Sequence, residues 1–90
     1  SGHSTAKQSQ YVGHVTEIDA EGWATVEVKN RFAVGDTLEI IHPEGNQTVT
    51  LEQMTRKGAA VEVAPGNGIQ VKIPNMQGKE KALIARVLNP

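Results

Sequence analysis

The run Trp23-Ala24-Thr25-Val26-Glu27-Val28-Lys29 decides the fold class of this chain. After the tryptophan, its side chains alternate between apolar and polar. This period of two is the pattern of a β-strand with one face buried and the other exposed. Residues 11–19, just before it, are rich in β-branched and aromatic side chains, and residues 19–22 form a turn sequence. The sequence therefore predicts a β-hairpin at the start of the structured chain.

The rest of the chain repeats this pattern. Further strands are predicted over residues 37–42, 47–54, 59–64, 69–73 and 82–88, separated by turn sequences rich in Gly, Pro and Asn. No segment has a sustained helical period. These observations predict an all-β fold, a small closed or nearly closed barrel of six to seven mostly antiparallel strands, with a β-sandwich as the alternative. The residues expected to face the core are Leu38, Ile40, Val49, Leu51, Val61, Val63, Ile69, Val71, Ile73, Leu83, Ala85 and Val87.

The length of 90 residues is enough for one domain and one core. We expect residues 11–90 to form the β-barrel domain and residues 1–10 to be a disordered leader. Its first residues, Ser1-Gly2-His3-Ser4, resemble an expression-vector remnant. The sequence contains no cysteine and no apolar run long enough to cross a membrane. A cytoplasmic location without membrane association is expected.

No recognisable catalytic site is predicted. The serines, Ser1, Ser4 and Ser9, all lie in the expected leader, and the three histidines have no metal-ligand spacing. The glycine-rich segment at residues 65–68 lacks the Lys-Ser/Thr of a phosphate-binding loop. We therefore expect no catalytic residue, no metal and no cofactor in this domain.

Basic residues are the candidates for partner contact. Lys29 and Arg31 end one predicted strand, beside Phe32, and further cations lie in the loop after residue 54 and on the strand at residues 69–73. If these positions share one rim, they form a modest positive patch. The net charge of −1 and the scattered aromatics weaken a reading as a dedicated nucleic-acid binder, and ordinary solvated charge is the alternative. The predicted RNA or partner contacts are Lys29, Arg31, Phe32, Arg56, Lys57 and Lys72.

Three blocks of sequence carry a family resemblance. They are residues 28–36 (VKNRF, then VGD), residues 42–46 (HP, then GN) and residues 64–66 (APG). With the runs between them, from about Tyr11 to Val87, the chain resembles the C-terminal barrel domain of the bacterial collagenase-like peptidases, unknown-type peptidase family thirty-two. The barrel also looks like the second domain of translation elongation factors.

The resemblance implies that this chain is part of a longer protein. In that family an N-terminal catalytic domain carries the activity, so the longer protein is expected to be an enzyme and this domain is not. Members are described as peptidases, or as proteins of tRNA uridine hydroxylation. The partners implied are the catalytic domain of the same protein and a tRNA or protein substrate.

Two roles follow from the resemblance. The domain is either an accessory module that positions RNA or protein substrate for the catalytic domain, or a structural lid or oligomerisation module that packs on that domain. The second role predicts an exposed apolar patch. Phe32, Ile41 and Ile84 are its expected members, because Ile41 and Ile84 fall out of phase with the residues predicted to face the core.

Overall fold

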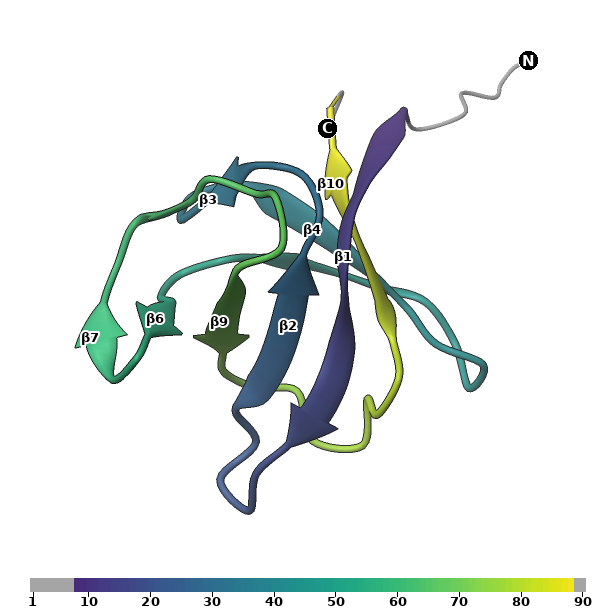
Figure 1. Ribbon diagram of the computed structural model, residues 1–90. Coiled ribbons are helices and arrows are strands. Elements are labelled where there is room, and N and C mark those ends of the chain that lie inside the picture. Colours follow the sequence, from purple (N-terminus) through teal and green to yellow (C-terminus); the bar gives the residue numbers. More distant parts are fainter. Residues whose placement is uncertain (1–7, 89–90) are drawn as a thin grey trace.

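A computed structural model describes residues 8–88 of the chain, and within them every regular element is a β-strand (Figure 1). All strand pairs are antiparallel. The strands are β1 (Ser9–Ile18), β2 (Ala24–Val28), β3 (Phe32–Ala33), β4 (Thr37–Ile41), β5 (Gln47–Thr50), β6 (Thr55–Arg56), β7 (Ala59–Ala60), β8 (Val63–Ala64), β9 (Gln70–Ile73) and β10 (Leu83–Val87).

Eight of these strands form one strongly curved sheet in the order β5-β4-β10-β1-β2-β9-β6-β7, and β3 pairs with β8 separately (Figure 1). The all-β, antiparallel prediction is confirmed. The edge strands β5 and β7 are not paired with each other, so the sheet is open and the predicted barrel closure is not confirmed. The strand count also exceeds the prediction, because short two-residue strands occur at β3, β6, β7 and β8.

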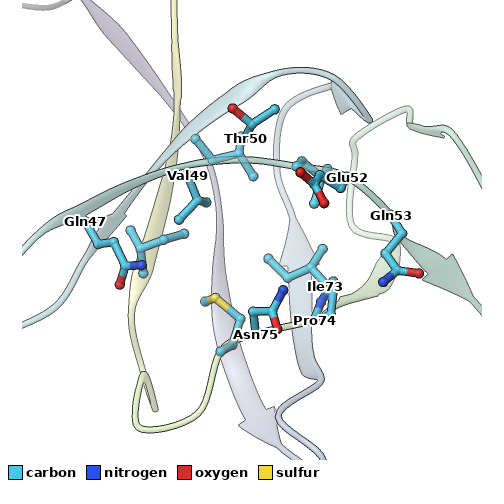
Figure 2. Close-up of a pocket in the computed structure, with 12 residues that line it drawn as sticks. Gln47, Val49, Thr50, Glu52, Gln53, Ile73, Pro74 and Asn75 are labelled. Carbon is cyan, nitrogen blue, oxygen red and sulfur yellow. The ribbon is translucent and has the colours of Figure 1, made fainter.

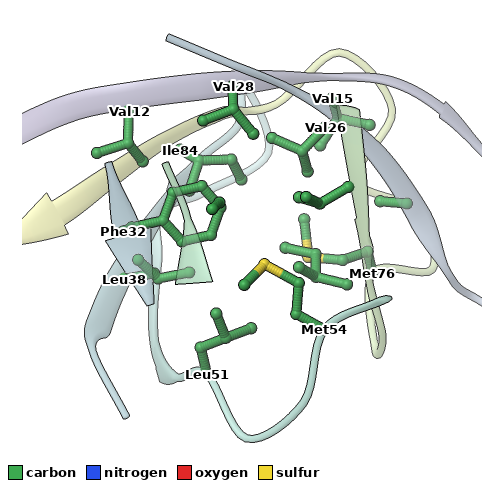
Figure 3. Close-up of a cluster of buried hydrophobic side chains, with 14 of the residues drawn as sticks. Val12, Val15, Val26, Val28, Phe32, Leu38, Leu51, Met54, Met76 and Ile84 are labelled. Carbon is green, nitrogen blue, oxygen red and sulfur yellow. The ribbon is translucent and has the colours of Figure 1, made fainter. Parts of the chain in front are cut away.

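The inner side of the curved sheet holds one aliphatic core (Figure 3). Phe32 and Ile84 are fully buried within it. Val12, Val15, Val26 and Val28 from β1 and β2 are also buried, as are two residues from segments without regular structure, Leu51 and Met54. Because the core residues lie on the inner side, the residues available to a partner lie on the outer side of the sheet.

A β-bulge at Val12 shifts the register of β1 against β10. Tyr11 lies opposite Ala85 but Gly13 lies opposite Ile84, so Val12 is an extra residue on β1. Without the bulge, Tyr11 and His14 would point to opposite faces, since neighbouring side chains in a strand alternate. With it they share the outer face, and the Tyr11 hydroxyl lies 2.9 Å from His14 Nδ1.

Gly13 is predicted from sequence as a bulge or bend, and the structure gives the reason for a glycine. A Cβ at this position would overlap the backbone carbonyl oxygen of Glu27 on β2. The close approach of the two backbones is therefore possible only without a side chain. The position joins the two strands that flank β1, because Gly13 pairs with Val28 as well as with Ile84.

Two turns behave as predicted. Asp19 closes the first hairpin, where its Oδ1 accepts hydrogen bonds from the backbone N–H groups of Glu21 (2.9 Å) and Trp23 (3.0 Å). Lys57 and Gly58 form the two-residue loop between β6 and β7, with φ of 53° and 82°. Two successive positive φ angles identify a type I′ turn, whose twist matches that of the flanking strands.

Several sequence expectations are wrong in detail. β1 begins at Ser9, two residues before the predicted start, while residues 1–7, including the suspected vector remnant, lie outside the described residues. The predicted strand at residues 59–64 is two short strands, and Val63 is exposed rather than buried. Val63 points outward because the chain breaks phase at residues 61–62, between β7 and β8.

The last strand is also misoriented by the prediction. Leu83, Ala85 and Val87 share a face as expected, but it is the outer face, and Ile84 faces the core. Leu83 is exposed, whereas Ala85 and Val87 are buried despite their outward direction. Four of the five residues of β10 are apolar, so period-two alternation cannot say which face is inside.

A candidate nucleic-acid interface and an apolar face

A shallow groove of about 530 Å³ lies on the outer side of the sheet, over β2, β9 and the β6–β7 hairpin. Its floor includes a cross-strand row in which Thr25 lies opposite Lys72, and Lys72 lies opposite Thr55. Directly opposed residues of neighbouring strands point to the same face, so the Lys72 side chain rises from the groove floor. The remaining lining residues are Glu17, Arg56, Lys57, Gly68, Ile69, Gln70 and Val71.

Three of the predicted contact residues meet in this groove, hereafter the basic groove: Arg56, Lys57 and Lys72. Lys57 and Lys72 are exposed, and Arg56 is partly buried. Among residues 8–88 none of the three forms an ion pair. The groove holds one acidic lining residue, Glu17, so its charge is positive overall. Sequence alone does not group these cations. The pairing of β6 with β9 brings together Thr55 and Lys72, which are 17 positions apart, and no sequence motif encodes that pairing.

The other predicted contact residues lie elsewhere. The Lys29 ammonium group is paired with the Glu27 carboxylate at 2.8 Å, on the outer face beside the groove. Hydrogen bonding and charge attraction within this pair lower the pKa of Glu27 and raise the pKa of Lys29. Arg31 is exposed in the loop between β2 and β3 and does not line the groove.

Phe32 cannot contact a partner as predicted. Its side chain is completely buried in the core, as Figure 3 shows, and offers no surface to a nucleobase or a protein partner. The predicted apolar patch loses Phe32 and Ile84 for the same reason, while Ile41 keeps its place because it is partly exposed on the outer face.

A second outer surface, hereafter the apolar face, lies over β4, β10 and β1. Its residues form a grid of two rows across the three strands. One row is Ile41, Leu83 and His14, and the other is Glu39, Ala85 and Tyr11. Tyr11 is 42% exposed and Leu83 is 44% exposed, both high values for large apolar side chains.

A narrower cleft of about 200 Å³ opens between the β5 edge and the segment that follows β9 (Figure 2). Its floor is made of core residues such as Leu38 and Ile40. The polar side chains at its rim are the amides of Gln47, Gln53 and Asn75, with Glu52 and Thr50. The cleft contains no predicted contact residue, and Glu52 is its sole charged lining residue, which disfavours backbone phosphate.

The described part of the chain contains no group of three or more His, Asp or Glu side chains placed to hold a metal ion. It also contains no helix with the length and apolar character needed to cross a membrane.

Comparison with known proteins agrees with this architecture. The chain is 44% identical over 88% of its length to tRNA hydroxylation protein P of Escherichia coli, and 35% identical over 97% to tRNA hydroxylation protein P of Haemophilus influenzae. It spans only 18% and 20% of those two proteins.

Among solved structures, the C-terminal domain of a Geobacillus thermoleovorans U32 peptidase superposes with a TM-score of 0.77 at 28% identity, covering 89% of this chain and 93% of that one. The selenomethionine variant of the same domain gives 0.76, covering 86% of this chain and 98% of that one. The profile described as Peptidase family U32 C-terminal domain matches residues 7–86. As the resemblance of its sequence blocks predicted, the chain belongs to the family of U32 peptidase C-terminal domains.

Proposed function

We propose that this domain is a non-catalytic accessory module that holds RNA, and specifically tRNA, for the catalytic part of a longer cytoplasmic enzyme. The observation that carries the proposal is the convergence of Arg56, Lys57 and Lys72 in one groove without ion-pair partners among residues 8–88. Cations that are free of internal partners can neutralise backbone phosphates, which supply much of the affinity of proteins for nucleic acids.

The conformation of Lys57 supports a binding role. A type I′ turn favours Asn, Asp or Gly at its first central position, where φ is positive. Lysine occupies that position here, with φ of 53°. Residues held in disfavoured backbone conformations are found more often at functional sites than elsewhere. Lysine at the hairpin tip places a cation at the rim of the groove.

The names of the relatives favour RNA over a protein substrate. Both curated relatives are called tRNA hydroxylation proteins, so the tRNA is the anion that the groove is proposed to contact. The modest number of cations fits a supporting contribution. The catalytic groups, and any cofactor that they need, belong in this proposal to the remainder of the longer protein.

The test uses two charge-removing variants of the longer protein that carries this domain. Lys57→Asn together with Lys72→Gln should weaken tRNA binding roughly tenfold at low salt and reduce the slope of log K against log salt by about 1.5, as expected for two lost phosphate contacts. Fluorescence anisotropy with labelled tRNA over a salt series measures both quantities.

A matched control exists within the domain. The double change Lys29→Gln and Arg31→Gln removes the same charge outside the groove and should leave the affinity and the salt slope nearly unchanged. Lys57→Asn alone should also raise the thermal midpoint, because Asn-Gly suits a type I′ turn better than Lys-Gly. Equal tRNA affinity in the groove double variant and the wild type at every salt concentration contradicts the proposal. Loss of peptide binding in its place would assign the groove to a protein substrate.

A further inference from the structure

The apolar face is the least expected surface of the domain. Large apolar side chains scattered singly on a surface need no explanation, but a contiguous group usually marks a protein contact. Here Ile41 lies opposite Leu83 across β4 and β10, and Tyr11 lies opposite Ala85 across β10 and β1. The four side chains are therefore neighbours on one face, and the bulge at Val12 is what brings Tyr11 and His14 into the grid.

The face is ordered before any partner arrives. The Tyr11 hydroxyl is hydrogen-bonded to His14 Nδ1 at 2.9 Å, which fixes an exposed aromatic ring against its own strand. Ala85, between Glu39 and Tyr11 in its row, is only 4% exposed, because the larger side chains around it cover it. A fixed tyrosine beside exposed leucine, with Glu39 and His14 at the margin, has the composition of an interface centre with a polar rim.

The position of the chain ends indicates the occupant. The backbone N–H of Leu88 donates to the carbonyl oxygen of Gln8 at 2.8 Å, so the first and last described residues lie side by side at the β1–β10 pair (Figure 1). Tyr11 follows Gln8 by three residues, a distance of about 10 Å along an extended strand. The chain thus enters the described structure at the margin of the apolar face, the side from which a preceding domain would approach.

The two curated relatives are long enough to contain such a preceding domain. The chain spans 18% and 20% of the two curated relatives, and its family is named for a C-terminal position. Two surfaces joined within one polypeptide meet at a raised effective concentration, so that even a small apolar contact between them is occupied.

We propose that the apolar face, centred on Tyr11, Ile41 and Leu83, is the docking surface for the domain that precedes this one in the same polypeptide. That domain presents an apolar patch to Tyr11 and Leu83 and a hydrogen-bond donor or cation to Glu39. Docking through β4, β10 and β1 leaves β2, β9 and the β6–β7 hairpin free, so the basic groove stays open to solvent. The inference does not depend on what the groove binds.

Covalent footprinting of the 90-residue chain and of the longer protein tests the proposal. A relative's C-terminal domain crystallised by itself, which supports the use of the isolated chain. Labelling of Tyr11 and Leu83 should fall about fivefold or more in the longer protein, because residues at an interface centre are fully buried. Val63, on β8 and 41% exposed, is the matched control and should label equally in the two proteins.

A pair of variants separates docking from folding. Leu83→Glu should leave the thermal midpoint of the isolated chain nearly unchanged, since the side chain already faces solvent, but should separate the unfolding of the two domains in the longer protein and increase its radius of gyration. Val63→Glu should do neither. Equal labelling of Tyr11 and Leu83 in both proteins overturns the proposal. Protection that appears in the isolated chain only at high concentration overturns it too, and assigns the face to a second copy.

Discussion

The basic groove and the apolar face are carried by the same sheet, yet they differ in nearly every property of their outward side chains. One row of opposed residues, Ile41, Leu83, His14, Glu27 and Gln70, crosses five strands from β4 to β9. It changes from apolar to polar at β1. The inner side of the same strands is uniformly aliphatic. The comparison teaches that the inner side of the sheet has one kind of side chain throughout, whereas the outer side divides into a basic region and an apolar region.

The largest effect on both regions is expected from a change in β1, which lies between them. Gly13→Val should destabilise the domain by about 2–3 kcal/mol, because a β-branched side chain would overlap the backbone of Glu27 and separate β1 from β2. Chemical denaturation of the 90-residue chain measures this loss. Gly78→Ala is the control. Its φ is 79° and no atom lies near the added methyl, so only backbone strain of about 1 kcal/mol is expected. A Gly13→Val domain as stable as the Gly78→Ala domain would show that the bulge does not require glycine.

A smaller change should affect only the part of the sheet that contains β4 and β10, through the contact of Asp36 with Arg86. Asp36 Oδ2 accepts a hydrogen bond from the Ala33 backbone N–H at 2.8 Å and lies 3.2 Å from Arg86 Nε on β10. Asp36→Ala should cost about 1–2 kcal/mol, since it leaves a partly buried N–H group without its acceptor. Arg86→Met removes only the ion pair and should cost less than about 1 kcal/mol. Denaturation midpoints of the two variants test this order, and a larger loss for Arg86→Met would reverse the interpretation.

The smallest effect is expected beside the groove, at the exposed Glu27–Lys29 pair. The pKa of Glu27 is lowered in the folded state by Lys29, so its contribution to stability is present above the ordinary carboxyl pKa of 4.5 and is lost as the pH falls through the lower folded value. Thermal midpoints of the wild type and Glu27→Gln should therefore differ slightly at pH 7 and converge as the pH falls through the lowered pKa of Glu27. A difference that grows on acidification would contradict the assignment of the pair.

How far the sequence could predict this structure depended on whether each strand has one apolar face. β2, with its strict alternation, was assigned correctly to within a residue at either end, and so was the inward orientation of Val71 and Ile73 on β9. β10 was misoriented because Leu83 and Ile84 are both apolar. Phe32 was taken for a surface residue because a short loop gave no periodicity from which to infer its burial.

The sequence predicts which cations belong to the candidate site but not that they lie together. Arg56, Lys57 and Lys72 could be named as exposed cations, but their convergence depends on the pairing of β6 with β9. Tyr11 was not recognised as part of an apolar face, since its place beside His14 depends on a one-residue bulge. Bulges and long-range strand pairings are set by tertiary packing, which a local pattern does not record.

The hydrogen bond between Leu88 and Gln8 also has a mechanical consequence. β1 and β10 are antiparallel neighbours, with Ser9 opposite Val87, so a force applied to the two ends would separate the strands from that end. Their hydrogen bonds would then break one after another rather than all at once in shear. The domain should therefore unfold at low force when it is pulled by its two ends. Unfolding should begin at the β1–β10 pair, which carries the apolar face.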